Sequence, residues 1–268
     1  MRGAAFATLL ALSASPALGC GVETDCEVPG GTYRMDLPDA EVTGAILFAH
    51  GYGGSAAGTI RNEGLRAMAT DRGLAFVALD AGEDDWALPN APHGSADTDG
   101  QSEFDYVAAV VADVTARTGV APDAMMLSGF SAGGMLVWNV LCATPDVVGG
   151  FVAVSGTFWD GPPETCATPV GSVIHIHGDA DTVVPREGRP IGDTRQGNIF
   201  RSLDLYRAIG GFGATRTVTD GALTCEEASN ADGAVLDFCS FEGGHSFSRT
   251  YLSHAWDRFV AAGVVTPG

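Results

Sequence analysis

The chain has 268 residues, 46% of them hydrophobic, and its 33 acidic residues against 14 basic ones give a formal net charge of −19 at pH 7. Such an acidic surface repels a phosphate backbone, so nucleic-acid binding is excluded as an expected function. The length suits one large domain or two small ones. No repeat, low-complexity tract or long linker interrupts the chain, and we therefore expect one domain.

The chain begins with a predicted export signal over residues 1–19. An arginine and a short apolar run precede Ala17 and Gly19, which stand at the small-residue positions of a signal-peptidase site before Cys20. The apolar run is too short to span a bilayer. We therefore expect a catalytic domain over 20–268, exported to the periplasm or the medium, without stable membrane insertion. The alternative is a lipoprotein that is acylated on Cys20.

Short apolar runs alternate with helical patterns along the rest of the chain. Nearly continuous apolar runs predict strands with both sheet faces covered; they are Ala45–Ala49, Ala75–Leu79, Ala124–Ser128, Phe151–Ser155 and Val173–His177. Strands are also predicted at Thr32–Leu37 and Val235–Phe241, and helices at Glu103–Arg117, Ala132–Cys142, Asn198–Ile209 and Arg249–Ala261. This order predicts an α/β fold with a mostly parallel central sheet and helices on both faces. Ligands bind at the carboxyl ends of the strands in such sheets.

The cysteines are even in number, which favours disulfides in an exported protein. They are Cys20, Cys26, Cys142, Cys166, Cys225 and Cys239. Sequence alone cannot fix their connectivity, but pairing each with its neighbour closes the shortest loops. The last two also lie in extended runs that face each other across a predicted turn at 230–233.

One serine stands between a predicted strand and a predicted helix. Ser131 lies in Gly129-Phe130-Ser131-Ala132-Gly133, with a glycine two residues away on either side. A glycine-rich turn can carry an idle serine, but the position between strand and helix is typical of a nucleophile elbow. The turn would lift the hydroxyl out of the sheet and aim the first helical amides at it. Those amides favour a developing negative charge.

A serine nucleophile needs a base and an orienting acid, which are expected downstream of this motif. His245, in the stretch EGGHS, follows the last predicted strand in a turn, and it is the expected base; His254 is the alternative. Asp181 is the expected acid, because it follows the penultimate strand and is stiffened by the Val-Val-Pro after it. Asp179, two residues earlier, is better placed to bond the backbone amides of its turn.

The reaction also needs backbone donors for the anion that forms on the substrate carbonyl. The stretch HGYGGS follows the first central strand and offers the amide of Tyr52. Ala132, directly after the serine, offers the second amide. An ordinary glycine loop is the alternative interpretation of the first stretch.

Four separated motifs agree with one another: HGYGGSA, GFSAGG, HGDADTVVP and EGGHS. Together they resemble the α/β-hydrolase fold, and within it the secreted esterases of the polyhydroxybutyrate depolymerase-like and feruloyl esterase-like family. The resemblance covers nearly all of the mature chain. It implies a serine carboxylic-ester hydrolase that needs no cofactor. The implied roles are nucleophile for Ser131, acid for Asp181, base for His245, and oxyanion donors for Tyr52 and Ala132.

The resemblance further implies aromatic residues beside the substrate. Trp159 corresponds to the family's aromatic residue after the fifth central strand, and Trp86 would wall the other side. A tryptophan in a loop serves as often in packing as in binding. The chain lacks the polymer-binding module that many solid-polymer degraders of the family carry. We therefore expect a monomer that acts on short-chain or hydroxyalkanoate oligomer esters, with feruloyl or acetyl-xylan esters of plant cell walls as the alternative.

Two other functions are considered. The stretch HIHGDAD echoes the cluster that binds zinc in binuclear metallohydrolases, but no histidine follows Asp179 as that pattern requires. Neighbouring strand histidines are more often satisfied core residues, so no metal is expected. A binding protein on the same scaffold would carry a broken triad, whereas all three candidate residues are present.

Overall fold

The structure is a computed structural model that describes residues 19–82, 85–92 and 99–268. The expected export signal, except for Gly19, lies outside the described residues. Within the described ranges, no helix combines the length and the apolar character needed to cross a membrane.

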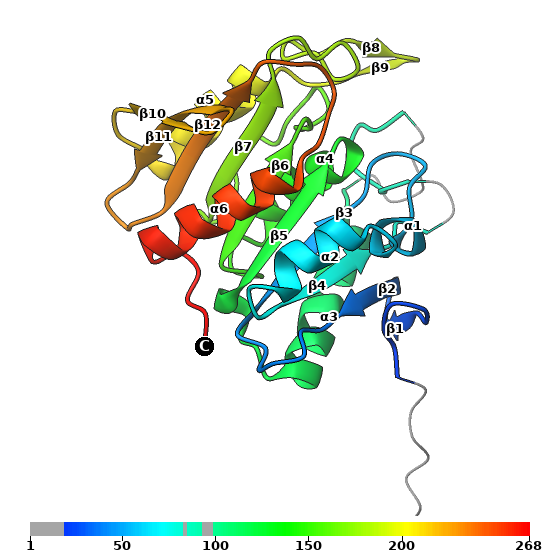
Figure 1. Cartoon of the computed structure of the whole chain (residues 1–268). Helices are drawn as coiled ribbons and strands as arrows, with labels where there is room; N and C mark the ends of the chain where they lie inside the picture. The colour runs from blue at the N-terminus through cyan, green and yellow to red at the C-terminus, as the bar shows by residue number, and fades with distance from the viewer. Residues whose placement is uncertain (1–18, 83–84, 93–98) are drawn as a thin grey trace, which may run out of the picture.

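A single large sheet dominates the described part of the chain, with ten strands in the order β1-β2-β4-β3-β5-β6-β7-β12-β11-β10 (Figure 1). Its strands are β1 (Cys26–Val28), β2 (Gly31–Asp36), β3 (Gly44–Ala49), β4 (Leu74–Leu79), β5 (Met125–Phe130), β6 (Gly150–Val154), β7 (Ser172–Gly178), β10 (Arg216–Asp220), β11 (Leu223–Ser229) and β12 (Val235–Phe241). The run from β4 to β12 is parallel, and antiparallel pairs extend it at both edges. The predicted α/β fold with a mostly parallel sheet is confirmed. A separate small hairpin joins β8 (Pro190–Ile191) to β9 (Thr194–Arg195).

Helices cover both faces of this sheet (Figure 1). The helices α1 (Ala56–Ile60), α2 (Glu63–Thr70) and α6 (Arg249–Ala262) share one hydrophobic core with one face, and α3 (Gln101–Thr118), α4 (Ala132–Ala143) and α5 (Ile199–Gly210) share another core with the opposite face. A 3₁₀ turn at Pro122–Ala124 leads into β5. Each helix predicted from sequence is present, whereas the short α1 and α2 were not predicted.

The central strands explain the continuous apolar runs of the sequence. Every residue of β3, β4, β6 and β7 is buried, since helices cover both of their sides. The helix α4 is also buried at every position from Ala132 to Cys142. Because the residue before α4 is Ser131, the candidate nucleophile stands at the end of one of the most enclosed elements of the molecule.

The six cysteines form three disulfides, and each cysteine pairs with its neighbour in the sequence. The bonds are Cys20–Cys26, Cys142–Cys166 and Cys225–Cys239. The second attaches the end of α4 to the segment between β6 and β7, and the third joins residues that face each other on β11 and β12. The connectivity that the sequence left open is thus the one that closes the shortest loops.

Candidate active site

Ser131 is the single residue between β5 and α4, and its backbone is strained. Its φ of 58° and ψ of −118° lie outside the regions that side-chain-bearing residues normally adopt. The surrounding structure holds this conformation: the Ser131 amide donates to the Val154 carbonyl at 2.9 Å, and the Ser131 carbonyl accepts from the Met135 amide at 3.0 Å. Strain of this kind is characteristic of functional sites.

The two glycines of the motif are required by close packing around this turn. A Cβ atom on Gly129 would lie 2.2 Å from the Gly133 carbonyl oxygen, and one on Gly133 would lie 2.1 Å from the Ala49 carbonyl oxygen. Neither position therefore tolerates a side chain unless the backbone moves. The glycines let the start of α4 press against the ends of β5 and β3, which fixes the position of Ser131.

The two remaining triad candidates are in direct contact. His245 Nδ1 lies 2.7 Å from Asp181 Oδ2, and the other carboxylate oxygen accepts the amides of Val183 and Val184, each at 2.9 Å. The Asp181 side chain is fully buried, whereas the His245 side chain is 14% exposed. Because a carboxylate only accepts, Nδ1 carries the proton of the neutral imidazole and Nε2 presents a lone pair.

Asp179 joins the two loops that carry Asp181 and His245. Its carboxylate accepts the Gly243 amide at 2.9 Å, and its own amide donates to the Phe241 carbonyl at 3.0 Å. The sequence predicted bonds to amides of its own turn, whereas this amide belongs to the loop after β12. Asp179 thus holds the loop after β7 against the loop after β12, whereas Asp181 reaches the imidazole.

His245 lies next to the turn that carries Ser131. Its ring centroid is 4.7 Å from that of Phe130, the residue immediately before the serine. Among the described residues, the hydrogen bond that His245 makes is the one to Asp181, and none joins it to the Ser131 hydroxyl. Catalytic hydrogen bonds in substrate-free enzymes are often long and tighten only in the complex. The structure therefore brings the loops of Asp181 and His245 next to Ser131, but it does not form the hydrogen bond between His245 and the serine hydroxyl.

The loop after β3 lies against the serine. A Cβ atom on Gly51 would be 3.3 Å from Ser131 Cβ. His50 holds the loop: its Nε2 accepts the Ala81 amide at 3.2 Å, so Nδ1 carries the proton and donates to the Gly51 carbonyl at 2.8 Å. The Gly54 amide also donates to the Gly51 carbonyl, at 2.9 Å. Sequence reasoning had not singled out His50 for this supporting position.

The predicted oxyanion donors lie on the two segments beside Ser131. Tyr52 directly follows Gly51, and its side chain is exposed. Ala132 opens α4, where first-turn amides have no acceptor within the helix. Their roles as oxyanion donors stay predictions.

The two tryptophans differ in their surroundings. Trp86 is 2% exposed, and its indole N–H donates to the His50 carbonyl at 2.9 Å. Trp86 therefore stabilises the loop after β3 through this hydrogen bond. Its direct contact with substrate stays a prediction. Trp159 follows β6 and lines a cavity of about 520 Å³, a volume in the range of small-molecule sites.

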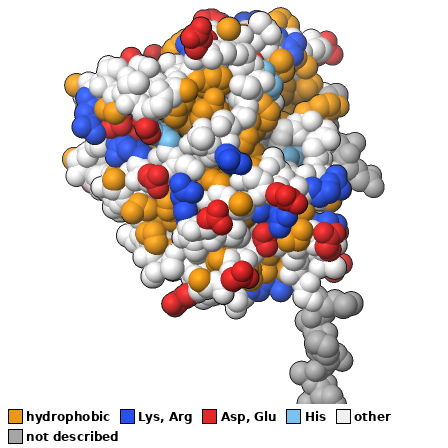
Figure 2. All heavy atoms as spheres, in the orientation of Figure 1, with side chains coloured by type: hydrophobic (Ala, Val, Ile, Leu, Met, Phe, Trp, Pro, Cys, Tyr) orange, Lys and Arg blue, Asp and Glu red, His pale blue; other side chains and the backbone are white. Residues whose placement is uncertain are grey.

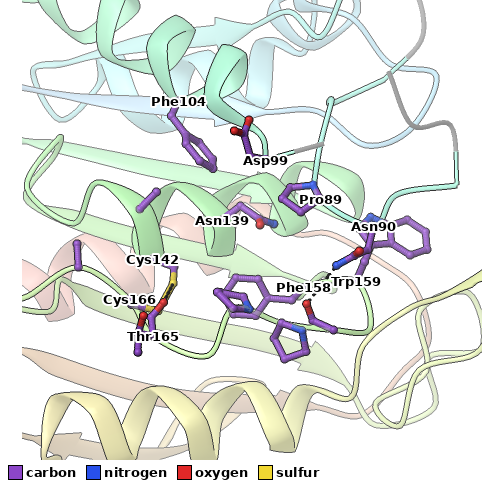
Figure 3. Close-up of a pocket in the computed structure, with 15 residues that line it drawn as sticks. Pro89, Asn90, Asp99, Phe104, Asn139, Cys142, Phe158, Trp159, Thr165 and Cys166 are labelled. Atoms are coloured by element: carbon purple, nitrogen blue, oxygen red, sulfur yellow. Dashed lines mark hydrogen bonds between the residues drawn. A yellow bond between two sulfur atoms is a disulfide. The ribbon is translucent and has the colours of Figure 1, made fainter. Parts of the chain in front are cut away.

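This cavity lies beside α4 (Figure 3). Trp159 and Phe158 stand toward one end, the Cys142–Cys166 disulfide stands at the other, and Asn139 lies between them. The described residues that line it do not include the three triad candidates. The described lining therefore does not place this cavity against the triad candidates.

The surface around the candidate site is apolar. In Figure 2, hydrophobic side chains gather in the upper part of the face shown, where the carboxyl ends of β5, β7 and β12 lie in Figure 1. Charged side chains cluster over the lower half. Tyr52 and Val183, from the loops after β3 and β7, are among the exposed hydrophobic residues. An apolar entrance suits a weakly polar substrate better than a charged one.

The other histidine candidates lie elsewhere. His175 and His177 are fully buried in β7 and hydrogen-bonded, as expected of core residues. His254 lies against the Cys225–Cys239 disulfide and contacts Asp220 at 2.6 Å. Among the described residues, the one cluster with metal-binding spacing comprises His254 and those two cysteines, whose sulfur atoms are bonded to each other.

Comparison with known proteins agrees with this geometry. Residues 33–189 match the family described as phospholipase/carboxylesterase, a stretch that includes Ser131 and Asp181 and ends before His245. NocK of Nocardia uniformis subsp. tsuyamanensis, named as an esterase, is 33% identical over 152 residues, which are 57% of this chain and 43% of that protein. The chain thus matches less than half the length of that relative.

Solved structures share the fold at low sequence identity. An acetyl xylan esterase from Aspergillus awamori has a TM-score of 0.62 at 11% identity, covering 87% of this chain and 94% of its own. A Bacillus cereus carboxylesterase has a TM-score of 0.58 at 11% identity, covering 86% and 93%. Together with the sheet order, these similarities show that the fold is an α/β-hydrolase fold.

Proposed function

Because the chain belongs to the phospholipase/carboxylesterase family, we propose that it hydrolyses carboxylic esters through Ser131, His245 and Asp181. The observation that carries this proposal is the contact between His245 Nδ1 and the buried Asp181 carboxylate, beside a strained serine at the start of α4. A structural ion pair would not require the neighbouring serine to adopt a strained backbone conformation.

The geometry suggests how each side chain would act. His245 Nε2 takes the proton of the Ser131 hydroxyl, and the serine oxygen attacks the ester carbonyl. The amides of Tyr52 and Ala132 donate to the oxygen of the tetrahedral anion. The imidazolium, held by Asp181, then protonates the leaving alcohol. Water repeats the sequence on the acyl-serine ester and releases the acid.

We further propose that the mature domain is exported. The three disulfides support this, because disulfides persist in oxidising compartments. The composition of residues 1–19 supports it as well. The proposed location is the periplasm or the medium.

For the substrate, we propose short-chain esters or esters of hydroxyalkanoate oligomers, in keeping with the polyhydroxybutyrate depolymerase-like motifs. The apolar residues Tyr52 and Val183 at the entrance support a weakly polar acyl group. Trp159 is proposed to contact the substrate from the segment after β6. Esters of plant cell walls are the second candidate, because the acetyl xylan esterase shares the fold.

A panel of esters tests the proposed function. The purified protein is assayed with p-nitrophenyl esters of increasing chain length, hydroxybutyrate oligomers, methyl ferulate and acetylated xylan. We expect the highest kcat/KM for hydroxybutyrate oligomers and p-nitrophenyl butyrate, because the exposed residues Tyr52 and Val183 make the surface beside the site apolar. A preference for methyl ferulate or acetylated xylan would select the second candidate. Failure to hydrolyse any ester would contradict the function itself.

A further inference from the structure

A chain of buried hydrogen bonds runs from α4 through β7 to the loop that carries Asp181. The indole N–H of Trp138 donates to His175 Nδ1 at 3.0 Å. His175 Nε2 lies 3.0 Å from His177 Nδ1. His177 Nε2 lies 2.8 Å from the Val184 carbonyl oxygen. The three side chains Trp138, His175 and His177 are completely buried, so no solvent competes for these contacts.

Trp138, at one end of this series of hydrogen bonds, fixes the direction of each of them. An indole N–H can only donate, so His175 Nδ1 must accept and cannot carry a proton. Burial holds the pKa of His175 well below its usual value, and the neutral ring therefore carries its proton on Nε2. His177 Nδ1 must therefore accept the hydrogen bond that His175 Nε2–H donates. Burial also lowers the pKa of His177, whose remaining proton then lies on Nε2.

His177, at the other end of this series of hydrogen bonds, faces the candidate acid Asp181. His177 Nε2 is 3.5 Å from Asp181 Oδ2, the same oxygen that contacts His245. The Val184 carbonyl accepts from His177, while the Val184 amide donates to Asp181 Oδ1. With the opposite tautomer, a lone pair on His177 would face both the Val184 carbonyl oxygen and the Asp181 carboxylate. The inferred tautomer replaces that repulsion with an N–H donor.

We propose that Trp138, His175 and His177 are positioning residues, which fix the His177 tautomer and thereby align the Asp181 carboxylate with His245. The proposal rests on the proposed function of Asp181. Among the described residues, the hydrogen bonds and ring contacts of these three side chains do not include Ser131. They act on the reaction only through the loop from Asp181 to Val184.

The tautomers are measured first, by nitrogen-15 NMR of the histidine side chains in the full wild-type chain. We expect a proton on Nε2 and none on Nδ1 in both His175 and His177. In Trp138→Phe, which keeps an aromatic ring but removes the donor, we expect His175 to populate the Nδ1–H form. A wild-type His177 protonated on Nδ1, or on both nitrogens, would overturn the proposal. This readout needs no enzymatic activity, so it is separable from a failure of the proposed function.

Kinetics with p-nitrophenyl butyrate supply the second test. Trp138→Phe is expected to lower kcat roughly ten- to a hundredfold with KM unchanged, because small misplacements of catalytic groups have effects of this order. Tyr206→Phe is the matched control. Tyr206 packs edge-on against Trp138, with ring centroids 5.7 Å apart, and donates to the Gly171 carbonyl at 2.9 Å. The control therefore loses a buried hydrogen bond beside the Trp138 ring that is not part of the series from Trp138 to His177. Tyr206→Phe should keep the wild-type kcat.

A conservative replacement separates positioning from packing. Glutamine at position 175 has both an acceptor for Trp138 and a donor for His177, whereas leucine has neither. We expect His175→Gln to retain most of the kcat that His175→Leu loses. Equal loss in both histidine variants, or in Tyr206→Phe and Trp138→Phe, would overturn the proposal in favour of a purely structural role.

Discussion

Replacement of Ser131 by alanine is expected to lower kcat for p-nitrophenyl butyrate by about 10⁴-fold or more, because the variant has no oxygen to form the acyl-enzyme. The change removes one atom from a partly exposed side chain. The hydrogen bonds that hold this turn are made by the backbone of residue 131, and alanine retains them. Loss of activity should therefore occur without loss of structure.

The folding of Ser131→Ala is checked by its thermal unfolding midpoint, which should match that of the wild type within a few degrees. The residual rate should come from the oxyanion donors and from binding alone. A correctly folded variant with wild-type turnover would show that another group performs the chemistry, and the assignment of the nucleophile would be wrong.

Replacement of Asp181 by asparagine is expected to lower kcat by about 10⁴-fold, because it reverses the His245 tautomer. The amides of Val183 and Val184 hold one oxygen of the carboxylate, and an asparagine oxygen would take that place. The asparagine NH₂ group would then face His245 Nδ1 and donate to it. The imidazole proton would move to Nε2, which could no longer accept the serine proton.

Asp179→Asn is the matched control, since it makes the same change two residues away. The Asp179 carboxylate accepts from the Gly243 amide through Oδ1, and asparagine retains that oxygen. We expect kcat within a few-fold of the wild type. Equal losses in Asp179→Asn and Asp181→Asn would contradict the division of roles between these two carboxylates.

Much of the fold and of the candidate site follows from local sequence signals. Runs such as Val173–His177 are apolar at successive positions because β7 is covered on both faces, and a short run of this kind is typical of buried parallel strands. The glycines around Ser131 are required because a Cβ atom at Gly129 or Gly133 would lie less than 2.5 Å from a backbone oxygen, so the motif reflects a steric requirement. Asp181 and His245 follow β7 and β12, which are neighbouring parallel strands, so both residues lie at the same edge of the sheet.

Features that depend on contacts between distant segments were not predictable. Trp86 is a loop residue in the sequence, but its burial beneath His50 becomes visible only in three dimensions. The hydrogen bonds from Trp138 to His177 join α4 to β7, and no spacing rule connects a helix residue with a strand more than thirty residues away. The short helices α1 and α2 begin at the capping residues Ser55 and Asn62, signals too weak to predict elements of this length.

The most direct test of the central claim is covalent labelling with a fluorophosphonate, followed by mass spectrometry of the proteolysed protein. The account predicts an adduct on the peptide that contains Ser131, lost in Ser131→Ala and formed much more slowly in Asp181→Asn. A wild-type protein that hydrolyses esters but carries no adduct on that peptide, or carries it on a different serine, would contradict the claim that Ser131 is the activated nucleophile.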